Sequence, residues 1–300
     1  MNISFKNWLI ATRPWSFPAS AMPALVAISY AFYLQQLQGL TVNYLYGVLA
    51  LLGAVFFQAS GNLIGDYFDY KYKVDRKESF GSSRMLVDEV FTPKAIFIFG
   101  ITLLAVGVLL GLFLFSQTGN DLLWIGAIGV LGTYFYYKLK FMALGDLLIF
   151  IIYGPLIVLG TFFVLTSKLD WTVLLLATPI GFLVVNILHA NNTRDIYHDG
   201  QANIKTQAML IGLKGSKIQY SLLGFGAYGA VILLVVFGIL HPISLLVLLS
   251  LPLLLKNSKQ MQTAEIEKPE NIKDLDGESA KLVMAFSVLL AVSFFLAVLF

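Results

Sequence analysis

Two clusters of amide and carboxylate side chains stand out in this sequence, because long apolar stretches surround both. The first cluster lies in the segment GNLIGDYFDYKYKVD and consists of Asn62, Asp66, Asp69 and Asp75. At about 100° per residue, positions i, i+4 and i+7 fall on one face of an α-helix. Asn62, Asp66 and Asp69 are therefore predicted to point the same way, with Asp75 beyond them in a loop that can fold back.

The second cluster lies in the segment NNTRDIYHD and consists of Asn191, Asn192, Arg194, Asp195 and Asp199. Its positions i, i+4 and i+8 are an asparagine and two aspartates, which again share one helix face. Each cluster thus presents an amide and two carboxylates in a row. A single aspartate at a helix end is often only a solvated carboxylate beside the membrane, but two matched rows favour a functional site.

Rows of oxygen ligands suit a hard cation. Mg²⁺ takes about six oxygens, usually from one or two carboxylates together with the phosphates of a substrate. Two facing rows would therefore hold a diphosphate between them through bridging Mg²⁺ ions. Basic residues near the clusters would neutralise the remaining phosphate oxygens, and the candidates are Arg76, Lys77, Arg84, Arg194 and Lys205.

The elements that carry the clusters are predicted to be membrane-spanning helices. Of the 300 residues, 58% are hydrophobic and 12% are charged, whereas about 25% of the residues of a soluble domain are charged. A helix needs roughly 20 apolar residues to cross a bilayer. We expect an all-α, polytopic bundle of about nine spans, near residues 15–36, 43–62, 93–116, 121–138, 145–166, 171–191, 219–239, 242–255 and 279–299.

The charge pattern orients this bundle in the membrane. With these spans, 19 of the 20 lysines and arginines lie on one side, and Lys168 alone lies on the other. Positive charge is retained in the cytoplasm, which predicts a cytoplasmic N-terminus, an external C-terminus and both clusters at cytoplasmic helix ends. The net charge is only +3, and no nucleic-acid partner is expected. The absence of cysteine excludes disulfides, thiolate metal sites and cysteine nucleophiles.

The two clusters resemble the two aspartate-rich motifs of the UbiA superfamily of intramembrane aromatic prenyltransferases. Further similar segments are ATRPWSFPAS near the start, GSSRMLV after the first cluster, and YYKLKFMALGDLLIF leading into GPLIVLG. Within the superfamily, the DYFD and NNTRD forms look most like MenA, the 1,4-dihydroxy-2-naphthoate polyprenyltransferase of menaquinone biosynthesis. The resemblance covers essentially the whole chain, which implies a single domain over residues 1–300.

The resemblance implies a helical bundle around a cavity that opens toward the cytoplasm and, laterally, to the lipid bilayer. Mg²⁺ and a prenyl diphosphate would bind between the clusters. The prenyl group would pass to an aromatic quinone precursor, with loss of the acceptor's carboxylate in the MenA case to give demethylmenaquinone. The membrane would be a bacterial inner membrane. The implied catalytic residues are Asp66, Asp69, Asp195 and Asp199, and the implied metal ligands are these four with Asp75, Asn62 and Asn191.

The implied substrate contacts extend beyond the acidic residues, to Asn62, Arg13, Arg76, Lys77, Arg84, Asn191, Asn192, Arg194, Lys205 and Tyr137. Some of these residues have simpler explanations, since Arg13 can anchor the topology and Tyr137 can be an interfacial aromatic. Two departures from the family pattern concern the phosphate contacts. The segment ANIKTQA stands where similar proteins often have G-K-T-L, and Gly65 stands where they often have asparagine.

Other functions stay open from the sequence. A secondary transporter also uses intramembrane carboxylates, but generally near the midplane on interrupted helices, whereas these carboxylates lie at helix ends. A non-catalytic scaffold would not need two matched rows. Within the enzyme class, the acceptor could instead be 4-hydroxybenzoate, a haem, a chlorophyllide or a glycerol-phosphate lipid.

Overall fold

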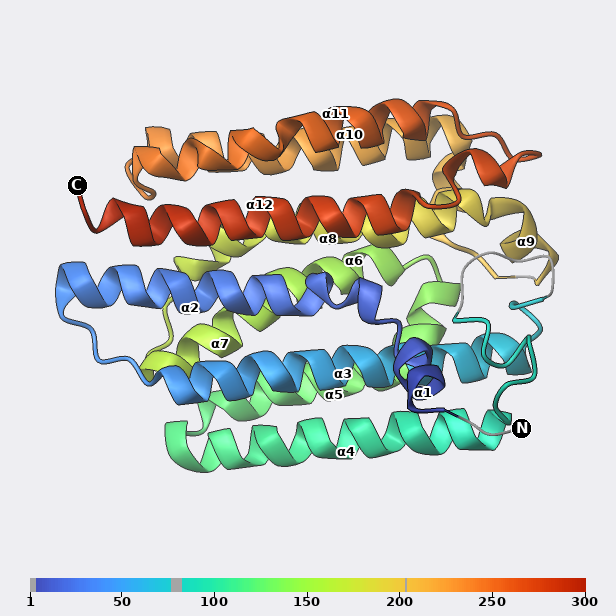
Figure 1. Cartoon of the computed structure of the whole chain (residues 1–300), viewed down its shortest axis with the longest axis horizontal. Coiled ribbons are helices and arrows are strands. Elements are labelled where there is room, and N and C mark those ends of the chain that lie inside the picture. Colours follow the sequence, from blue (N-terminus) through green and yellow to red (C-terminus); the bar gives the residue numbers. More distant parts are fainter. Residues whose placement is uncertain (1–3, 77–82, 203) are drawn as a thin grey trace.

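The computed structural model describes residues 4–76, 83–202 and 204–300, which form an all-α bundle of long helices running along one axis (Figure 1). The expected fold class is confirmed, because no strand occurs in these ranges. The first elements are α1 (Phe5–Ala11), the 3₁₀ turn η1 (Pro14–Ser16), α2 (Pro18–Gln38), α3 (Tyr44–Lys71), α4 (Pro93–Thr118) and α5 (Asp121–Phe141). They are followed by α6 (Gly145–Ile151), the π turn η2 (Ile152–Leu156), α7 (Ile157–Thr166), α8 (Val173–Arg194), α9 (Ile196–Gln201), α10 (Gln207–Val236), the 3₁₀ helix η3 (Pro242–Ser250), α11 (Leu251–Gln262), the 3₁₀ turn η4 (Pro269–Ile272) and α12 (Leu275–Ala297).

Nine helical segments of the described chain are long and apolar enough to cross a membrane, as predicted. Several spans join two or three elements: α6, η2 and α7 form the span Gly145–Thr166, and η3 with α11 forms the span Pro242–Gln262. The chain is thus a multi-pass membrane protein. Its helices begin with ordinary caps, since the side chains of Asn43 and Thr92 accept hydrogen bonds from the first turns of α3 and α4.

The predicted boundaries differ from the structure where polar residues remain helical. Helix α3 continues past the predicted end at residue 62 to Lys71, because Asp66 and Asp69 find cationic partners inside the bundle. Helix α10 begins at Gln207 instead of near residue 219, and a left-handed φ of 69° at Gly212 marks a kink in its first turns. Apolar periodicity ends too early to reveal these extensions.

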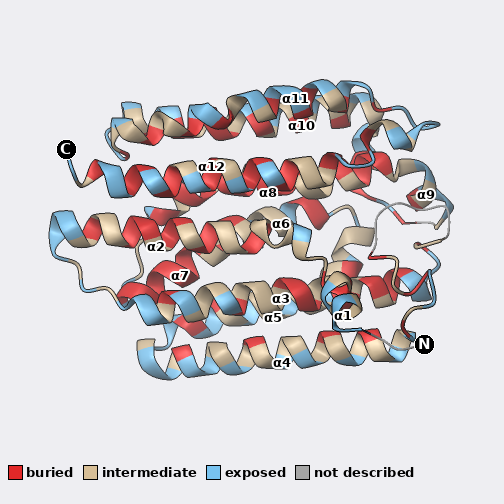
Figure 2. Cartoon of the chain, in the orientation of Figure 1, coloured by how far each residue is buried: buried red, intermediate tan, exposed pale blue. Residues whose placement is uncertain are grey.

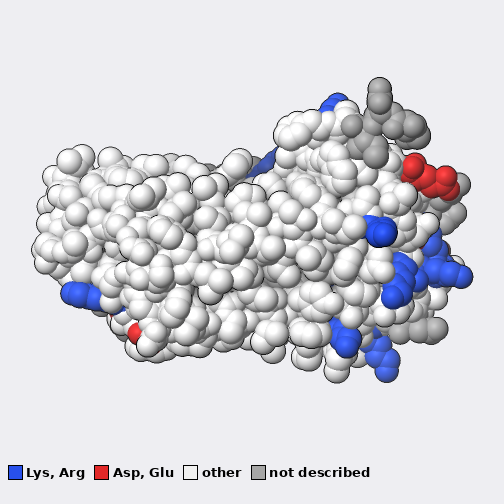
Figure 3. Space-filling view, turned by 90° about the horizontal axis from the view of Figure 1, so that it is seen from below, with Lys and Arg blue, Asp and Glu red and all other residues white. Residues whose placement is uncertain are grey.

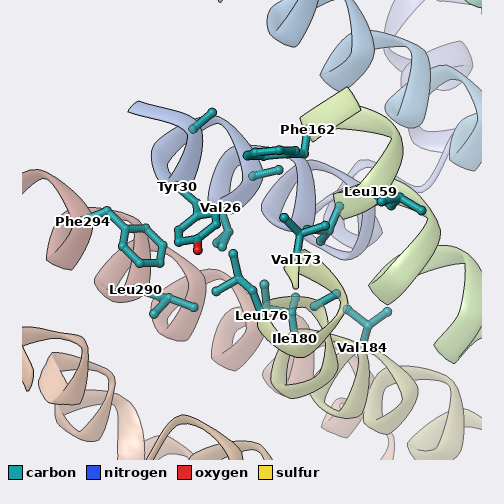
Figure 4. Packing of buried hydrophobic residues seen from close by; sticks show 14 of the residues in the cluster. Val26, Tyr30, Leu159, Phe162, Val173, Leu176, Ile180, Val184, Leu290 and Phe294 are labelled. Atoms are coloured by element: carbon teal, nitrogen blue, oxygen red, sulfur yellow. The ribbon is translucent and has the colours of Figure 1, made fainter. Parts of the chain in front are cut away.

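The main hydrophobic core lies between α2, α7, α8 and α12, where Val26, Tyr30 and Phe294 are buried (Figure 4). Helices α4 and α5 lie at the edge of the bundle and expose many apolar side chains, Leu109 and Leu131 among them (Figure 2). In a membrane protein such side chains face lipid, which accepts apolar surface but not unpaired backbone groups.

A close approach of two glycines sets the position of α8, which carries the second cluster. A Cβ atom added at Gly154 would lie 3.1 Å from the Cα atom of Gly181, so only glycine lets α8 pack this tightly on η2. The η2 segment is a π turn that contains Pro155. Such turns change the direction in which neighbouring side chains point, and here Ile152 and Tyr153 are directed toward the interior cavities.

Basic side chains gather at one end of the bundle, with a single basic patch at the far end (Figure 3). The basic end is the one that holds α1, α9 and the connection after α3 (Figure 1). The described parts of the long connections, residues 72–76, 83–92, 204–206 and 263–268, lie at this end. The structure therefore agrees with the predicted separation of charge, and the assignment of this end to the cytoplasm stays a prediction.

Candidate active site

A cavity of about 170 Å³ with both charged and apolar wall residues opens near the basic end of the bundle, among residues of α3, α5, α8, α9 and α12. Both clusters contribute to its wall. The structure thus brings together residues far apart in sequence, namely Asn62, Asp66, Asp69 and Asp75 of the first cluster and Asn191, Asn192, Asp195 and Asp199 of the second.

Asp66 is buried on α3 and has two partners from other parts of the chain. It forms an ion pair with Arg13, and its Oδ2 atom accepts a hydrogen bond of 2.6 Å from the Ser83 hydroxyl. Arg13 has a left-handed φ of 55° between α1 and η1, a conformation that residues other than glycine seldom adopt. Arg13 lines the cavity, so its side chain does more than anchor the topology.

Asp69 is also buried on α3, and it pairs with a lysine of α5. Its Oδ2 atom lies 3.2 Å from Nζ of Lys140, whereas its Oδ1 atom is buried without a hydrogen-bond partner in the described chain. Tyr136 stands one helical turn before Lys140 on α5, and both side chains line the cavity. The pair at positions i and i+4 therefore presents a phenol and an ammonium group toward the first cluster.

The spacing of the second cluster predicts one continuous helix, but the structure divides the cluster between two helices. Helix α8 ends at Arg194, Asp195 is its C-terminal cap residue, and Asp199 lies in the short helix α9. The backbone N–H of Asp199 donates to the Asp195 carbonyl at 2.8 Å, which holds α9 against the end of α8. Both carboxylates still reach the cavity.

Arg194 is buried and does not line the cavity, in contrast to the expected substrate contact. Its Nε and Nη2 atoms donate to the two carboxylate oxygens of Asp195 at 2.9 and 2.8 Å. Its Nη1 atom donates to the Lys273 carbonyl at 3.0 Å and lies 3.8 Å from the carboxylate of Asp276. A two-pronged arginine–carboxylate pair is strong and directional, so Arg194 fixes the carboxylate of Asp195.

The asparagines of the two clusters present different ends of their amides. The Nδ2 atom of Asn62 donates to the Thr12 carbonyl at 2.9 Å and to Ser16 Oγ at 3.1 Å, and its oxygen has no hydrogen-bond partner among the described residues. The Oδ1 atom of Asn191 accepts a hydrogen bond of 2.8 Å from Arg194, and its NH₂ group has no partner in the described part of the chain. The oxygen of Asn62 therefore suits a metal ion, whereas the oxygen of Asn191, an expected ligand, is already engaged.

The acidic groups of the cavity are crowded enough to hold protons. Burial raises the pKa of Asp75 to about 7, and the carboxylates of Asp69 and Asp66 add to the effect. Burial also raises the pKa of Asp199 to about 7, although Lys140 opposes the rise. A divalent cation would relieve this repulsion and give the unpartnered Asp69 oxygen a ligand role, so these residues fit Mg²⁺.

The metal would not be held by the protein alone. Within residues 4–76, 83–202 and 204–300, no three carboxylate, imidazole or thiol groups converge closely enough to hold a metal ion. Mg²⁺ commonly keeps only one or two carboxylates and completes its shell with water and substrate phosphates. The separated carboxylates therefore leave coordination positions for ligands other than the protein.

Two of the expected basic contacts, Arg76 and Lys205, lie elsewhere. Arg76 donates a hydrogen bond of 2.6 Å to Gln201 and thereby ties the connection after α3 to α9. Lys205 is exposed, and neither it nor Arg76 lines the cavity. Lys77 lies outside the described residues.

Arg84 and Tyr137 are also placed away from the cavity. Arg84 forms an ion pair of 3.0 Å with Asp88. The ring of Tyr137 stacks on Phe68, with 3.7 Å between the ring centroids. The neighbouring residue, Tyr136, is the tyrosine of this helix end that reaches the cavity.

The sequence did not assign several lining residues to the site, among them Tyr136, Lys140, Asp276 and Gln58. Tyr136 and Lys140 are spaced to share one helix face, and this spacing could have identified them as site residues. No sequence pattern identifies Asp276, because it lies in a mixed-charge segment typical of a solvated connector. Gln58 is buried on α3, donates to the Ser16 carbonyl at 2.7 Å and accepts from the Ser20 N–H at 3.1 Å, and so fixes the start of α2.

A second cavity, of about 310 Å³, adjoins the first and lies between α3, α4, α5, η2 and α7. Its walls are almost wholly apolar, and the helices α4 and α5 that enclose it border lipid. The two cavities share four wall residues, Gln58, Thr133, Ile152 and Tyr153. A ligand with a charged head and a long apolar tail would therefore have a place for each part.

Sequence comparisons give the relatives of the chain. A profile of the UbiA prenyltransferase family matches residues 10–271. The Drosophila melanogaster "UbiA prenyltransferase domain-containing protein 1 homolog" is 31% identical over 311 residues, covering 97% of this chain and 80% of the relative. The Homo sapiens "UbiA prenyltransferase domain-containing protein 1" is 33% identical over 283 residues, covering 87% of this chain and 77% of the relative.

Structure comparisons find the same architecture in archaeal proteins. The apo structure of a UbiA homolog from Aeropyrum pernix K1 has a TM-score of 0.68 at 14% identity, covering 93% of this chain and 96% of that chain. A UbiA homolog from Archaeoglobus fulgidus bound to DMAPP and Mg²⁺ has a TM-score of 0.58 at 14% identity, covering 95% of this chain and 99% of that chain. At such low identity these likenesses establish the fold.

Proposed function

The chain belongs to the UbiA prenyltransferase family, and we propose that it transfers a polyprenyl group from a prenyl diphosphate to an aromatic quinone precursor in a Mg²⁺-dependent reaction. One observation carries this proposal. Six carboxylates and two cationic side chains line one cavity, and an apolar cavity beside lipid shares four wall residues with it. The presence of DMAPP and Mg²⁺ in the Archaeoglobus homologue supports it.

The diphosphate would lie between the clusters. Asp66, Asp69 and Asp75 on one side and Asp195 and Asp199 on the other would hold Mg²⁺, with the oxygen of Asn62 close by. Bound Mg²⁺ would neutralise the charge that develops on the departing diphosphate. Arg13, Lys140 and the NH₂ group of Asn191 would donate to phosphate oxygens that the metal leaves free.

The prenyl tail would occupy the apolar cavity. Thr133, Ile152 and Tyr153 border both cavities and would surround the first carbons of the tail. In the reaction, the bond between the allylic carbon and oxygen breaks, and its electron pair leaves with the diphosphate. Exclusion of water by the apolar walls would protect the carbocation until the aromatic ring attacks it.

For the acceptor, the resemblance of the clusters to MenA favours 1,4-dihydroxy-2-naphthoate, which forms a carbon–carbon bond to the prenyl group. The bond to the acceptor's carboxylate then breaks, its electrons restore the aromatic ring, and CO₂ leaves. A bicyclic ring needs room, and Gly61 and Gly65 lie in the cavity wall, where Gly65 has open space at its Cβ position. Ala190 offers no such room, because it is buried in a separate hydrophobic cluster.

The location of the protein is part of the proposal. The excess of basic residues at the cavity end favours a cytoplasmic site with the C-terminus outside. A bacterial inner membrane is the setting that a MenA-like function would have. The similar proteins from Drosophila melanogaster and Homo sapiens are animal proteins.

A competition assay tests the acceptor. Purified protein is incubated with Mg²⁺, a labelled prenyl diphosphate, and 1,4-dihydroxy-2-naphthoate and 4-hydroxybenzoate at equal concentration, and products are resolved by mass. We expect prenylated naphthalene product with release of CO₂, since a cavity wide enough for two rings holds one ring loosely and misplaces its nucleophilic carbon. A predominance of prenylated hydroxybenzoate would refute the naphthoate assignment and leave prenyl transfer intact.

A further inference from the structure

A buried polar network lies directly behind the second cluster. Asp146 of α6 and His189 of α8 are both shielded from solvent, and Oδ2 of Asp146 lies 2.8 Å from Nδ1 of His189. The other ring nitrogen of His189 lies 3.2 Å from the backbone carbonyl of Ser216 on α10. The side chain of Gln219, also on α10, donates to Asp146 Oδ2 at 3.1 Å. The network therefore joins three helices, α6, α8 and α10.

The partners of His189 determine where its protons lie. The Ser216 carbonyl can only accept, so Nε2 of His189 carries a proton. On the other side, Nδ1 faces a carboxylate oxygen, and one proton must lie between these two atoms for the contact to be a hydrogen bond. The pair as a whole is neutral in either arrangement. A neutral, fully bonded pair of this kind is a rigid support in an apolar setting.

This support fixes the amide of Asn192. The second carboxylate oxygen of Asp146, Oδ1, accepts a hydrogen bond of 3.2 Å from Nδ2 of Asn192. Because a carboxylate oxygen accepts, the nitrogen of the amide must face Asp146. Asn192 lines the cavity, and its oxygen has no hydrogen-bond partner among the described residues. The amide thus offers the cavity an acceptor.

The neighbouring asparagine has the opposite arrangement, since Asn191 offers an NH₂ group to the cavity. A diphosphate has only acceptor oxygens, so it would be attracted by Asn191 and repelled by the oxygen of Asn192. A phenolic hydroxyl is a donor and would bind that oxygen. The two adjacent amides therefore suit different ligand groups: Asn191 suits the diphosphate, and Asn192 suits a hydroxyl group.

We propose that Asn192 is a recognition residue for the aromatic acceptor, whose hydroxyl donates to Asn192 Oδ1, and that Asp146 and His189 are positioning residues that hold this amide in place. The inference rests on the proposed function, because it takes the acceptor to be a hydroxyarene. It gives α6 and α10 a role in acceptor selection although neither helix carries a cluster.

The test compares binding of 1,4-dihydroxy-2-naphthoate with that of 1,4-dimethoxy-2-naphthoate, in which both hydroxyls are capped. Equilibrium dialysis without Mg²⁺ measures both affinities in the wild type and in Asn192→Ala. We expect the wild type to prefer the dihydroxy compound by about tenfold, which corresponds to roughly 1.4 kcal/mol for one hydrogen bond. Asn192→Ala should bind the two compounds nearly equally. An unchanged preference in Asn192→Ala would overturn the proposal.

The positioning role is tested with Asp146. Asp146→Ala removes the partner of the Asn192 amide and should abolish the preference, whereas Asp146→Asn keeps an oxygen that accepts from Nδ2 and should restore most of it. Tyr220→Phe is the control, because its hydroxyl bonds Ser279 at 2.7 Å in a buried position away from the cavity. A full preference for the dihydroxy compound in Asp146→Ala would overturn the positioning role. If Asp146→Ala does not fold, His189→Ala replaces it. Loss of the preference in His189→Ala would support the positioning role, and a retained preference would overturn it.

Kinetics separate this inference from the proposed function. With Mg²⁺ and a prenyl diphosphate, Asn192→Ala should raise the KM for the naphthoate about tenfold and leave the KM for the diphosphate within about twofold. Wild-type protein that forms no prenylated product from any hydroxyarene would contradict the proposed function itself. Wild-type turnover with equal rises of both KM values in Asn192→Ala would contradict only the role of Asn192.

Discussion

Asp66 and Asp69 of the first cluster are paired with cations from other helices, whereas Asp195 of the second cluster is paired with the arginine beside it in sequence. The first pairings use Arg13 and Lys140, both of which line the cavity. The second uses Arg194, which is buried behind it. Similar sequence patterns thus give different electrostatic surroundings. The first cluster has cations that can turn to a substrate, and the second is fixed by a cation that cannot.

The carboxylates of both clusters should be needed equally, despite this difference. We expect Asp69→Asn and Asp199→Asn each to lower turnover by about 100- to 1,000-fold, because each removes charge where the diphosphate leaves. Initial rates of prenyl transfer at saturating substrates provide the measurement. Asp121→Asn, at the start of α5 and away from the cavity, is the matched control. Turnover near the wild-type rate in either cluster variant would limit the site to one cluster.

The cations should differ in what they contribute, and Lys140 is the clearest case. Lys140→Met should lower turnover by about 100-fold, since it removes a donor directed at the phosphate site. Lys138→Met is the control: Lys138 is on the same helix end but exposed, with its ammonium group 5.7 Å from the centre of the Phe135 ring. Equal losses in the two lysine variants would show that the helix end, and not the cavity contact, matters.

Arg194 should matter mainly for stability. Removing one partner of a buried ion pair costs about 3–5 kcal/mol, because a charge is left uncompensated. The apparent Tm of Arg194→Met in detergent should fall further than that of Arg13→Met, because Arg194→Met also removes the hydrogen bonds to the Lys273 carbonyl and to Asn191. In Arg13→Met, the Ser83 hydroxyl still donates to Asp66. A larger Tm loss in Arg13→Met would reverse the proposed contrast between the clusters.

A smaller effect concerns pH. Since burial raises the pKa of Asp75 and Asp199 to about 7, both groups take up protons as the pH falls through this value. Mg²⁺ needs the deprotonated forms, so the metal must displace protons at low pH. The Mg²⁺ concentration for half-maximal turnover should rise several-fold from about pH 8 to about pH 6. A constant Mg²⁺ requirement over this range would contradict the burial of these carboxylates.

Much of the fold follows from the sequence, because the bilayer imposes long apolar helices and separates their polar connections. The row formed by Asn62, Asp66 and Asp69 was likewise predictable from helical spacing. The break in the second row was not, since the end of α8 at Arg194 is held by contacts with Lys273 and Asp276, which are distant in sequence. Local spacing identifies candidate ligands but not which end of an amide, or which basic residue, faces the cavity.

The basic residues illustrate this limit further. Arg76, Arg84 and Lys205 lie near the clusters in sequence, but the structure turns them to other partners or to solvent. Lys140 is distant from both clusters in sequence, but its side chain lines the cavity. Asp276 comes from the last span, where nothing in the local sequence separates it from a solvated connector. Proximity in sequence therefore does not predict which charged side chains line a site that several helices form.

The central claim is that Mg²⁺ couples the two clusters to a prenyl diphosphate. The most direct measurement is equilibrium binding of a labelled prenyl diphosphate to EDTA-treated protein, with Mg²⁺ then restored, in the wild type, Asp66→Ala and Asp195→Ala. The account predicts tight binding only for the wild type with Mg²⁺, and weak binding in both variants. Binding that persists in EDTA, or that survives loss of either carboxylate, would contradict it.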